Sequence, residues 1–136
     1  MTLTEFIELH AGQFVNFDTV YGPQCMDLFR VYVRDVLGDD YQPKPVRNAA
    51  AVWYNYPERY WIKVFNNVAN FPQPGDVVIW SKRYSRSLTG HIAICVEADV
   101  NRMLCFSQND PGGTPAMLRE YGYRHVLGWL RPRVEG

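Results

Sequence analysis

Cys25 and His91 are the two residues of this chain best suited to do chemistry together. A thiolate becomes an efficient acyl-transfer catalyst when an imidazole lies within hydrogen-bond reach and a third group orients that imidazole. Cys25 begins an amphipathic helical pattern, so the amides and dipole of the helix N-terminus should lower its pKa. The alternatives are a cysteine packed as a small hydrophobic residue and a strand-end histidine bonded to a carbonyl. The pair predicts nucleophilic attack on an acyl group.

The third group, which would orient the imidazole, has two candidates. If two strands pair around a turn near Val100, the antiparallel register places Asn109 opposite His91. Ser107 shares the face of Asn109, because side chains alternate along a strand. Asn109 would accept a hydrogen bond from the imidazole, and Ser107 is the second choice. The competing interpretation of Asn109 is a turn residue before Asp110.

The loop before Cys25 carries oxygen-bearing groups at the spacing of a calcium-binding loop. Its first, third, fifth, seventh, ninth and twelfth places hold Asn16, Asp18, Val20, Gly22, Gln24 and Asp27. Val20 and Gly22 would offer main-chain carbonyls, and Asp27 is shorter than the usual bidentate glutamate. A plain turn into the helix, with Asp27 favoured in its first turn, explains the same residues. Calcium and a capping turn are therefore alternative predictions.

Helical patterns come first in the chain, and strand-like patterns follow. The helical patterns cover residues 4–14, 25–37 and 47–56, with Thr4 as a cap and Gly38 ending the second. The strand patterns cover residues 61–65, 76–80, 91–97, 103–109, 116–121 and 126–131. This order predicts an α+β domain with N-terminal helices packed on one side of a mostly antiparallel sheet. Residues 1–136 are expected to form a single domain, with 132–136 resembling a linker.

The composition favours a folded, charge-balanced protein. Of 136 residues, 47% are apolar and 15% aromatic, which excludes a disordered chain. Fourteen basic and fourteen acidic side chains cancel, so no broad field would recruit nucleic acid or an anionic membrane. Three cysteines without a CxxC pair argue against a disulfide framework and a structural zinc site. No apolar run reaches the roughly 20 residues that cross a bilayer, and the N-terminus lacks a signal-peptide pattern.

Four short motifs together resemble the CHAP family of cysteine- and histidine-dependent amidohydrolases and peptidases. In chain order they are Gly22-Pro23-Gln24-Cys25-Met26-Asp27, Pro74-Gly75-Asp76-Val77-Val78-Ile79-Trp80, Gly90-His91-Ile92-Ala93-Ile94 and Gln108-Asn109. The resemblance extends from about Phe14 to Arg131. It implies a papain-like α+β fold and cleavage of amide bonds in bacterial peptidoglycan, as in phage endolysins, tail-associated lysins and bacterial autolysins.

The resemblance also implies roles for the motif residues. Cys25 would be the nucleophile and His91 the general base, and Gln24 would shape the oxyanion site together with the Cys25 amide. Some phage members bind calcium before the cysteine, which implies a structural ion held by Asn16, Asp18, Val20, Gly22 and Asp27. Family members often carry an acidic residue two places before the asparagine, where this chain has Ser107. The third catalytic residue therefore stays open between Asn109 and Ser107.

The implied function is cysteine-dependent hydrolysis of a peptidoglycan amide in phage lysis, with an endopeptidase favoured over an N-acetylmuramoyl-L-alanine amidase. Such a domain would be made in the host cytoplasm, act at the cell wall as a monomer, and could be part of a longer lysin. Nucleic acid and membranes are not expected partners. Candidates for a substrate groove are Trp53, Tyr54, Trp80 and Tyr84, although core packing better explains Trp80. The alternatives are a non-catalytic wall-binding module and a papain-like acyl transferase.

Overall fold

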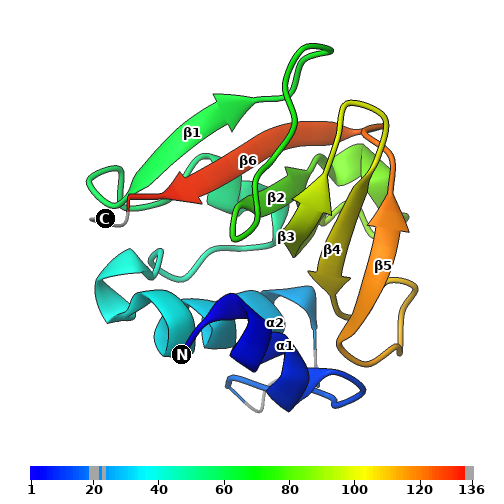
Figure 1. Cartoon of the computed structure of the whole chain (residues 1–136). Helices are drawn as coiled ribbons and strands as arrows, with labels where there is room; N and C mark the ends of the chain where they lie inside the picture. The colour runs from blue at the N-terminus through cyan, green and yellow to red at the C-terminus, as the bar shows by residue number, and fades with distance from the viewer. Residues whose placement is uncertain (19–21, 23, 134–136) are drawn as a thin grey trace.

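The computed structural model describes residues 1–18, 22 and 24–133 and has the predicted α+β order (Figure 1). The helices are α1 (Leu3–His10) and α2 (Cys25–Tyr32), with a π-helical segment η1 (Val33–Leu37) and the 3-10 turns η2 (Asp39–Tyr41), η3 (Ala50–Trp53) and η4 (Lys82–Tyr84). The strands are β1 (Trp61–Phe65), β2 (Val77–Trp80), β3 (His91–Ala98), β4 (Met103–Ser107), β5 (Met117–Tyr121) and β6 (Val126–Pro132). Over this described part, no helix has the length and apolar character to span a bilayer.

The helix α2 begins at Cys25, as predicted. The segment continues through η1 and ends at Gly38, whose φ of 112° favours glycine. α1 starts one residue earlier than predicted because Thr2, not Thr4, caps it. Thr2 Oγ1 accepts from the Glu5 amide at 3.1 Å, and the Glu5 carboxylate accepts from the Thr2 amide at 3.0 Å. The N-caps of α1 and α2 are thus Thr2 and Gln24, residues that directly precede each helix in the sequence.

The helix predicted over residues 47–56 is only the short turn η3. The Ala50 amide donates to the Thr89 carbonyl at 3.0 Å instead of to a helical carbonyl, which ties η3 to the segment before β3. The Asn48 side chain accepts from the Ala51 amide at 3.0 Å, a capping type of bond that makes the turn begin after Asn48 instead of at Arg47. A long-range bond and a local side chain together explain why the predicted helix is shortened.

The strands form one sheet in the order β1-β6-β2-β3-β4-β5, and each neighbouring pair is antiparallel. Ile94 lies opposite Phe106, which confirms the register predicted from a turn near Val100. The register shifts after Cys95, toward the turn, so the opposite end of the hairpin keeps its predicted pairing. β4 ends at Ser107, two residues earlier than predicted.

Apolar side chains pack on both faces of the sheet, and α1 and α2 lie on one side of it (Figure 1). Phe6 of α1 and Phe29 of α2 belong to the same buried cluster as Ile92 of β3. A second cluster comes from the strands alone and consists of Val78, Trp80, Ala93, Cys95, Met103, Cys105, Tyr121, Val126 and Trp129. Because side chains alternate along β3, His91 shares the side of Ala93 and stands at the end of this second cluster.

Candidate active site

The Cys25 thiol lies against the start of β3. α2 packs on β3, and the backbone amide of Ile92, the residue after His91, lies close enough to the Cys25 sulfur to act on its pKa. Burial raises the pKa of the Cys25 thiol to about 11, while the amides of Ile92 and Met26 act in the opposite direction. The expectation of a lowered thiol pKa is therefore wrong, because desolvation outweighs the helix N-terminus. The expected proximity to the start of the His91 strand is present.

Gly90 sets the position at which the His91 strand begins. Its φ is 76°, and a Cβ here would lie 2.5 Å from the Trp80 carbonyl oxygen and 2.7 Å from the Ala50 side chain. Glycine alone permits this approach, as the sequence predicts. The contact brings η3, β2 and β3 together beside the imidazole.

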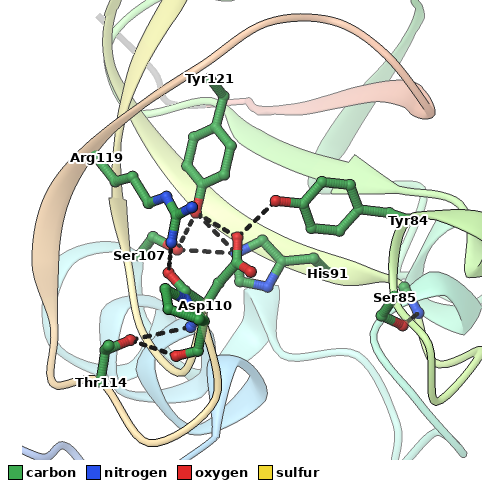
Figure 2. Close-up of polar contacts among 10 residues, drawn as sticks. Tyr84, Ser85, His91, Ser107, Asp110, Thr114, Arg119 and Tyr121 are labelled. Atoms are coloured by element: carbon green, nitrogen blue, oxygen red, sulfur yellow. Dashed lines mark hydrogen bonds and ion pairs between the residues drawn. The ribbon is translucent and has the colours of Figure 1, made fainter.

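His91 is buried, and one edge of its ring faces a group of oxygen atoms (Figure 2). Its Nε2 lies 2.8 Å from Ser107 Oγ, 3.4 Å from Tyr121 Oη and 3.8 Å from Asp110 Oδ2. The other ring nitrogen, Nδ1, points away from these oxygens (Figure 2). The protein therefore holds the ring by Nε2 and leaves Nδ1 for a different partner.

Aromatic rings enclose the imidazole. The ring centroids of Trp80, Tyr84 and Tyr121 lie 5.1, 5.9 and 6.0 Å from that of His91. Burial lowers the pKa of His91 to about 4, although the Asp110 charge acts to raise it. The imidazole is consequently neutral at neutral pH and able to accept a proton. Trp80 is buried in the core, as expected, and Tyr84 stacks on the site.

Ser107, rather than Asn109, is the hydrogen-bond partner of His91. Asn109 has a φ of 61°, and its Oδ1 accepts from the Gly113 amide at 2.7 Å. The Asn109 amide donates to the Thr114 carbonyl at 3.0 Å. The predicted register is correct, but the chain leaves the strand before Asn109 can present its side chain to the ring. Asn109 thus has the turn role that was its competing interpretation, and Ser107 makes the contact predicted for Asn109.

Gln24 and Gln108 join the segment before Cys25 to the end of β4. Gln24 is the N-cap of α2, and its carbonyl accepts from Gln108 Nε2 at 2.8 Å. The buried Gln108 side chain also accepts from the Val15 amide at 2.7 Å and donates to the Val15 carbonyl at 2.8 Å. Gln24 itself is exposed, and its oxyanion role stays a prediction. Gln108 therefore ties the residue before Cys25 to the end of β4, a contact that its place in the motif does not reveal.

Asp110 and Tyr121 also belong to the site, although the sequence patterns do not indicate them. Asp110 Oδ2 accepts from Tyr84 Oη at 2.7 Å and from Tyr121 Oη at 2.8 Å. Tyr121 Oη lies 2.8 Å from Ser107 Oγ. Figure 2 shows these side chains converging on one edge of the imidazole. In the sequence Asp110 has only the pattern of a turn before a proline, so no local signal connects it with a histidine.

The predicted calcium loop is organised around Asp27. The buried Asp27 carboxylate accepts from the Phe17 amide at 3.1 Å and from the Gln24 amide at 2.8 Å, which is a capping arrangement. Burial raises the pKa of Asp27, and the Asp18 charge acts in the same direction. Of the other predicted ligands, the structure describes Asn16, Asp18 and Gly22, whereas Val20 lies outside the described residues. Among residues 1–18, 22 and 24–133, no three His, Cys, Asp or Glu side chains group as a metal site, and the predicted ligand set relies also on amide and carbonyl oxygens.

Solved structures with this fold include endolysins. The endolysin LysIME-EF1 matches with a TM-score of 0.78 and 26% identity over 100% of this chain and 66% of that one. Ly7917 with the hydrolyzing product of MDP matches with a TM-score of 0.71 and 16% identity over 93% of this chain and 60% of that one. A second structure of Ly7917 matches with a TM-score of 0.68 and 17% identity, covering 97% and 62%. The chain thus spans less than two thirds of the length of these proteins.

The match extends to a family model. No curated protein matches the chain. The model of the CHAP domain matches residues 14–109, which include Cys25, His91 and both positions considered for the third group. This range is more than half of the chain and contains all four motifs. The chain therefore belongs to the CHAP domain family.

Proposed function

We propose that this chain is the catalytic domain of a cysteine-dependent peptidoglycan hydrolase that cleaves an amide bond of the bacterial cell wall. One observation carries the proposal: the start of α2 packs on the start of β3, so that Cys25 lies near the amide of Ile92, the residue that follows the buried His91. Membership of the CHAP family and the likeness to the endolysin LysIME-EF1 support peptidoglycan as the substrate. The same likeness supports action at the cell wall in phage lysis.

The first half of the proposed reaction begins from a neutral pair. Burial keeps the pKa of Cys25 high and that of His91 low, so a thiol faces an uncharged base at neutral pH. Since Nε2 of His91 is bonded to Ser107, Nδ1 takes the thiol proton as the sulfur attacks the carbonyl carbon. The Cys25 amide, at the N-terminus of α2, and the Gln24 side chain would stabilise the oxyanion.

In the second half of the reaction, the same imidazole first acts as a general acid and then again as a general base. The C–N bond breaks as the His91 imidazolium gives its proton to the leaving amine, and a thioester remains on Cys25. His91 then takes a proton from a water molecule that attacks the thioester. That proton returns to the sulfur as the carboxylic acid product leaves. Both halves depend on the orientation of one ring.

The variant Cys25→Ser tests the reaction. We expect lysis of purified peptidoglycan, followed as loss of turbidity, to fall by about 10³-fold or more, because serine is a far weaker nucleophile in this setting. Wall binding and the thermal midpoint of unfolding should be retained. The matched control is Cys105→Ala, which removes a buried thiol of β4 outside the site and should keep the lytic rate. Unchanged lysis by Cys25→Ser would discard the proposal.

The wild-type protein separates the competing functions. A wall-binding module would sediment with peptidoglycan without releasing fragments, and an acyl transferase would leave the glycan and its peptides uncut. Within hydrolysis we favour an endopeptidase. Mass spectrometry of the fragments should then show new peptide N-termini, whereas an amidase would free the lactyl carboxyl group of the sugar.

We also propose that a structural calcium ion braces the turn before α2, held by Asn16, Asp18, Val20, Gly22 and Asp27. In support, the Asp18 charge acts on the Asp27 carboxylate, and two carboxylates in one turn are a setting in which a divalent cation is favoured. Calcium should raise the thermal midpoint of unfolding, and Asp18→Asn should weaken that rise. An identical midpoint with calcium and with a chelator would overturn this assignment without affecting the thiol chemistry.

A further inference from the structure

A buried line of hydroxyl groups joins the imidazole of His91 to the carboxylate of Asp110. It runs from His91 Nε2 to Ser107 Oγ at 2.8 Å, and from Ser107 Oγ to Tyr121 Oη at 2.8 Å. The last step, from Tyr121 Oη to Asp110 Oδ2, is also 2.8 Å (Figure 2). Ser107 is 1% exposed and Tyr121 is 7% exposed, so the line is shielded from water.

The carboxylate determines the direction of every hydrogen bond in this line. An ionised carboxylate only accepts, so the Tyr121 hydroxyl must donate to Asp110. The Tyr121 oxygen then accepts from the Ser107 hydroxyl. The Ser107 oxygen in turn accepts from the ring, which places the imidazole proton on Nε2 of His91. Nδ1 is left with its lone pair, as a base for the thiol requires.

The tyrosines stay protonated in this setting. Burial first, and the Asp110 carboxylate in addition, raise the pKa of Tyr121 well above its usual range. The same two causes raise the pKa of Tyr84, whose hydroxyl donates to the same Oδ2 at 2.7 Å. Both hydroxyls are therefore donors across the working pH range. Within the described part of the chain, Tyr84 makes no hydrogen bond to Ser107, so Tyr121 is the tyrosine that connects Asp110 with Ser107.

Hydrogen bonds to main-chain groups stabilise the turn that carries Asp110. The Asp110 amide donates to Thr114 Oγ1 at 3.1 Å, and Thr114 Oγ1 donates to the Pro111 carbonyl at 2.7 Å. The Arg119 guanidinium donates to the Asp110 carbonyl oxygen. These bonds use main-chain groups of Asp110 and Pro111 and leave the Asp110 carboxylate to the two tyrosines.

We propose that Asp110 is a positioning residue that fixes His91 as the Nε2–H tautomer through Tyr121 and Ser107, and that its charge stabilises the imidazolium formed during hydrolysis. The inference rests on the proposed function. Members of the family often carry an acidic residue at the place of Ser107, next to the ring. Here a serine stands at 107, and the negative charge comes from position 110 through two hydroxyls, with Asp110 Oδ2 still 3.8 Å from Nε2.

The variant Asp110→Asn keeps the shape of the side chain and removes the charge. An amide can both donate and accept, so Tyr121 is no longer obliged to donate, and the ring proton should distribute over both nitrogens. We expect the lytic rate at neutral pH to fall by about 10²-fold, since a misplaced tautomer cannot take the thiol proton. The acid limb of the rate profile should also move to lower pH, because the Asp110 charge raises the pKa of His91.

Tyr121→Phe and Tyr84→Phe form a matched pair, because each removes one hydroxyl from the same carboxylate oxygen. If Asp110 acts through the line, Tyr121→Phe should lose about tenfold or more in rate and Tyr84→Phe clearly less. If Asp110 only stabilises its turn, the two losses should be equal and follow the thermal midpoints. This pair keeps the inference open to refutation even where Asp110→Asn folds poorly.

Nitrogen NMR of the histidine rings gives a readout that does not depend on lysis. In the wild type, the Nδ1 resonance of His91 should be that of an unprotonated nitrogen, and in Asp110→Asn it should move toward an average of both tautomers. An unchanged tautomer and rate profile in Asp110→Asn, with Cys25→Ser inactive, would overturn the inference and leave the proposed function standing. An active Cys25→Ser would overturn the proposed function, and this inference with it.

Discussion

The two sides of the His91 ring are built in different ways. On the side of the thiol, the important contacts run through the main chain. The Ile92 amide lies near the Cys25 sulfur and acts to lower its pKa, and the Gln24 carbonyl accepts from Gln108. A backbone amide or carbonyl is present whatever the side chain, so this side depends on where the chain runs.

On the opposite side, the contacts run through side chains. Ser107, Tyr121 and Asp110 each contribute one oxygen to a continuous line, and Tyr84 adds a hydroxyl from η4. Replacement of any one of these side chains breaks the line of hydrogen bonds but leaves the backbone in place. We therefore expect changes to the residues that hold the thiol in place, as distinct from Cys25 itself, to act mainly through stability, and changes on the hydroxyl side mainly through rate.

Apart from loss of the nucleophile, the largest effect is expected where the two sides meet, at His91 itself. His91→Gln should lower the lysis rate of purified peptidoglycan by about 10³-fold, within the range that general acid–base catalysis contributes. Circular dichroism at neutral pH should show the wild-type fold, because the glutamine amide can still bond to Ser107. A rate within about tenfold of wild type would mean that another group is the base.

The burial of His91 also predicts how stability depends on pH. Its pKa is lowered from 6.5 to about 4, so the unfolded chain takes up the proton first as the pH falls. The stabilisation is complete above the unfolded value and is lost as the pH falls toward the folded one, with a total of roughly 3 kcal/mol. Urea unfolding from about pH 7 to about pH 4 measures this loss. His91→Gln should flatten the decline, and an equal decline in both proteins would contradict the assignment.

Gln108→Leu tests the thiol side through its main-chain contacts. The change keeps most of the volume but leaves both Val15 main-chain groups and the Gln24 carbonyl without their partner. We expect the free energy of unfolding to fall by about 2–3 kcal/mol, because buried polar groups without partners are costly. Urea unfolding measures the loss, with Tyr121→Phe on the other side as the comparison. The contrast between the two sides fails if Tyr121→Phe is the more destabilising change.

The smallest effect is expected at the two positions considered for the third group. Ser107→Ala should lower the lytic rate by roughly tenfold, because Nε2 loses its nearest acceptor but keeps Tyr121 Oη, at 3.4 Å, as a second one. Asn109→Gly, which suits the φ of 61°, should lose less, because Asn109 bonds within its own turn. Initial rates of the two purified variants, compared at equal folded fraction, decide between them. A larger loss in Asn109→Gly would restore Asn109 as the orienting group.

Short-range patterns predicted the elements that carry the nucleophile and the base. The helix that starts at Cys25, the close approach at Gly90 and the hairpin register around Val100 are all confirmed. Each depends on residues a few positions apart or on the alternation along two adjoining strands. The predicted helix over 47–56 is wrong for the opposite reason, since its length is limited by a bond from Ala50 to the distant Thr89.

The candidate site was predicted in part. The thiol and the imidazole follow from residue type and spacing, and Ser107 was the second choice for the contact that it makes. Asn109 was preferred because the strand pattern extends past Ser107, and only the observed turn shows that its side chain is used elsewhere. Asp110 had no signal, because a turn residue before a proline has the same pattern with or without a histidine nearby.

By itself, the sequence determined the order of helices and strands, the place of Cys25 at a helix start, and the four motifs that mark the family. These properties depend on residue type and on spacing along the chain. Only the tertiary structure decided which group holds His91 and how readily Cys25 and His91 ionise. The reason is physical: the hydroxyl line joins β4, β5 and a turn, and desolvation depends on everything that packs around a group, not on its neighbours in sequence.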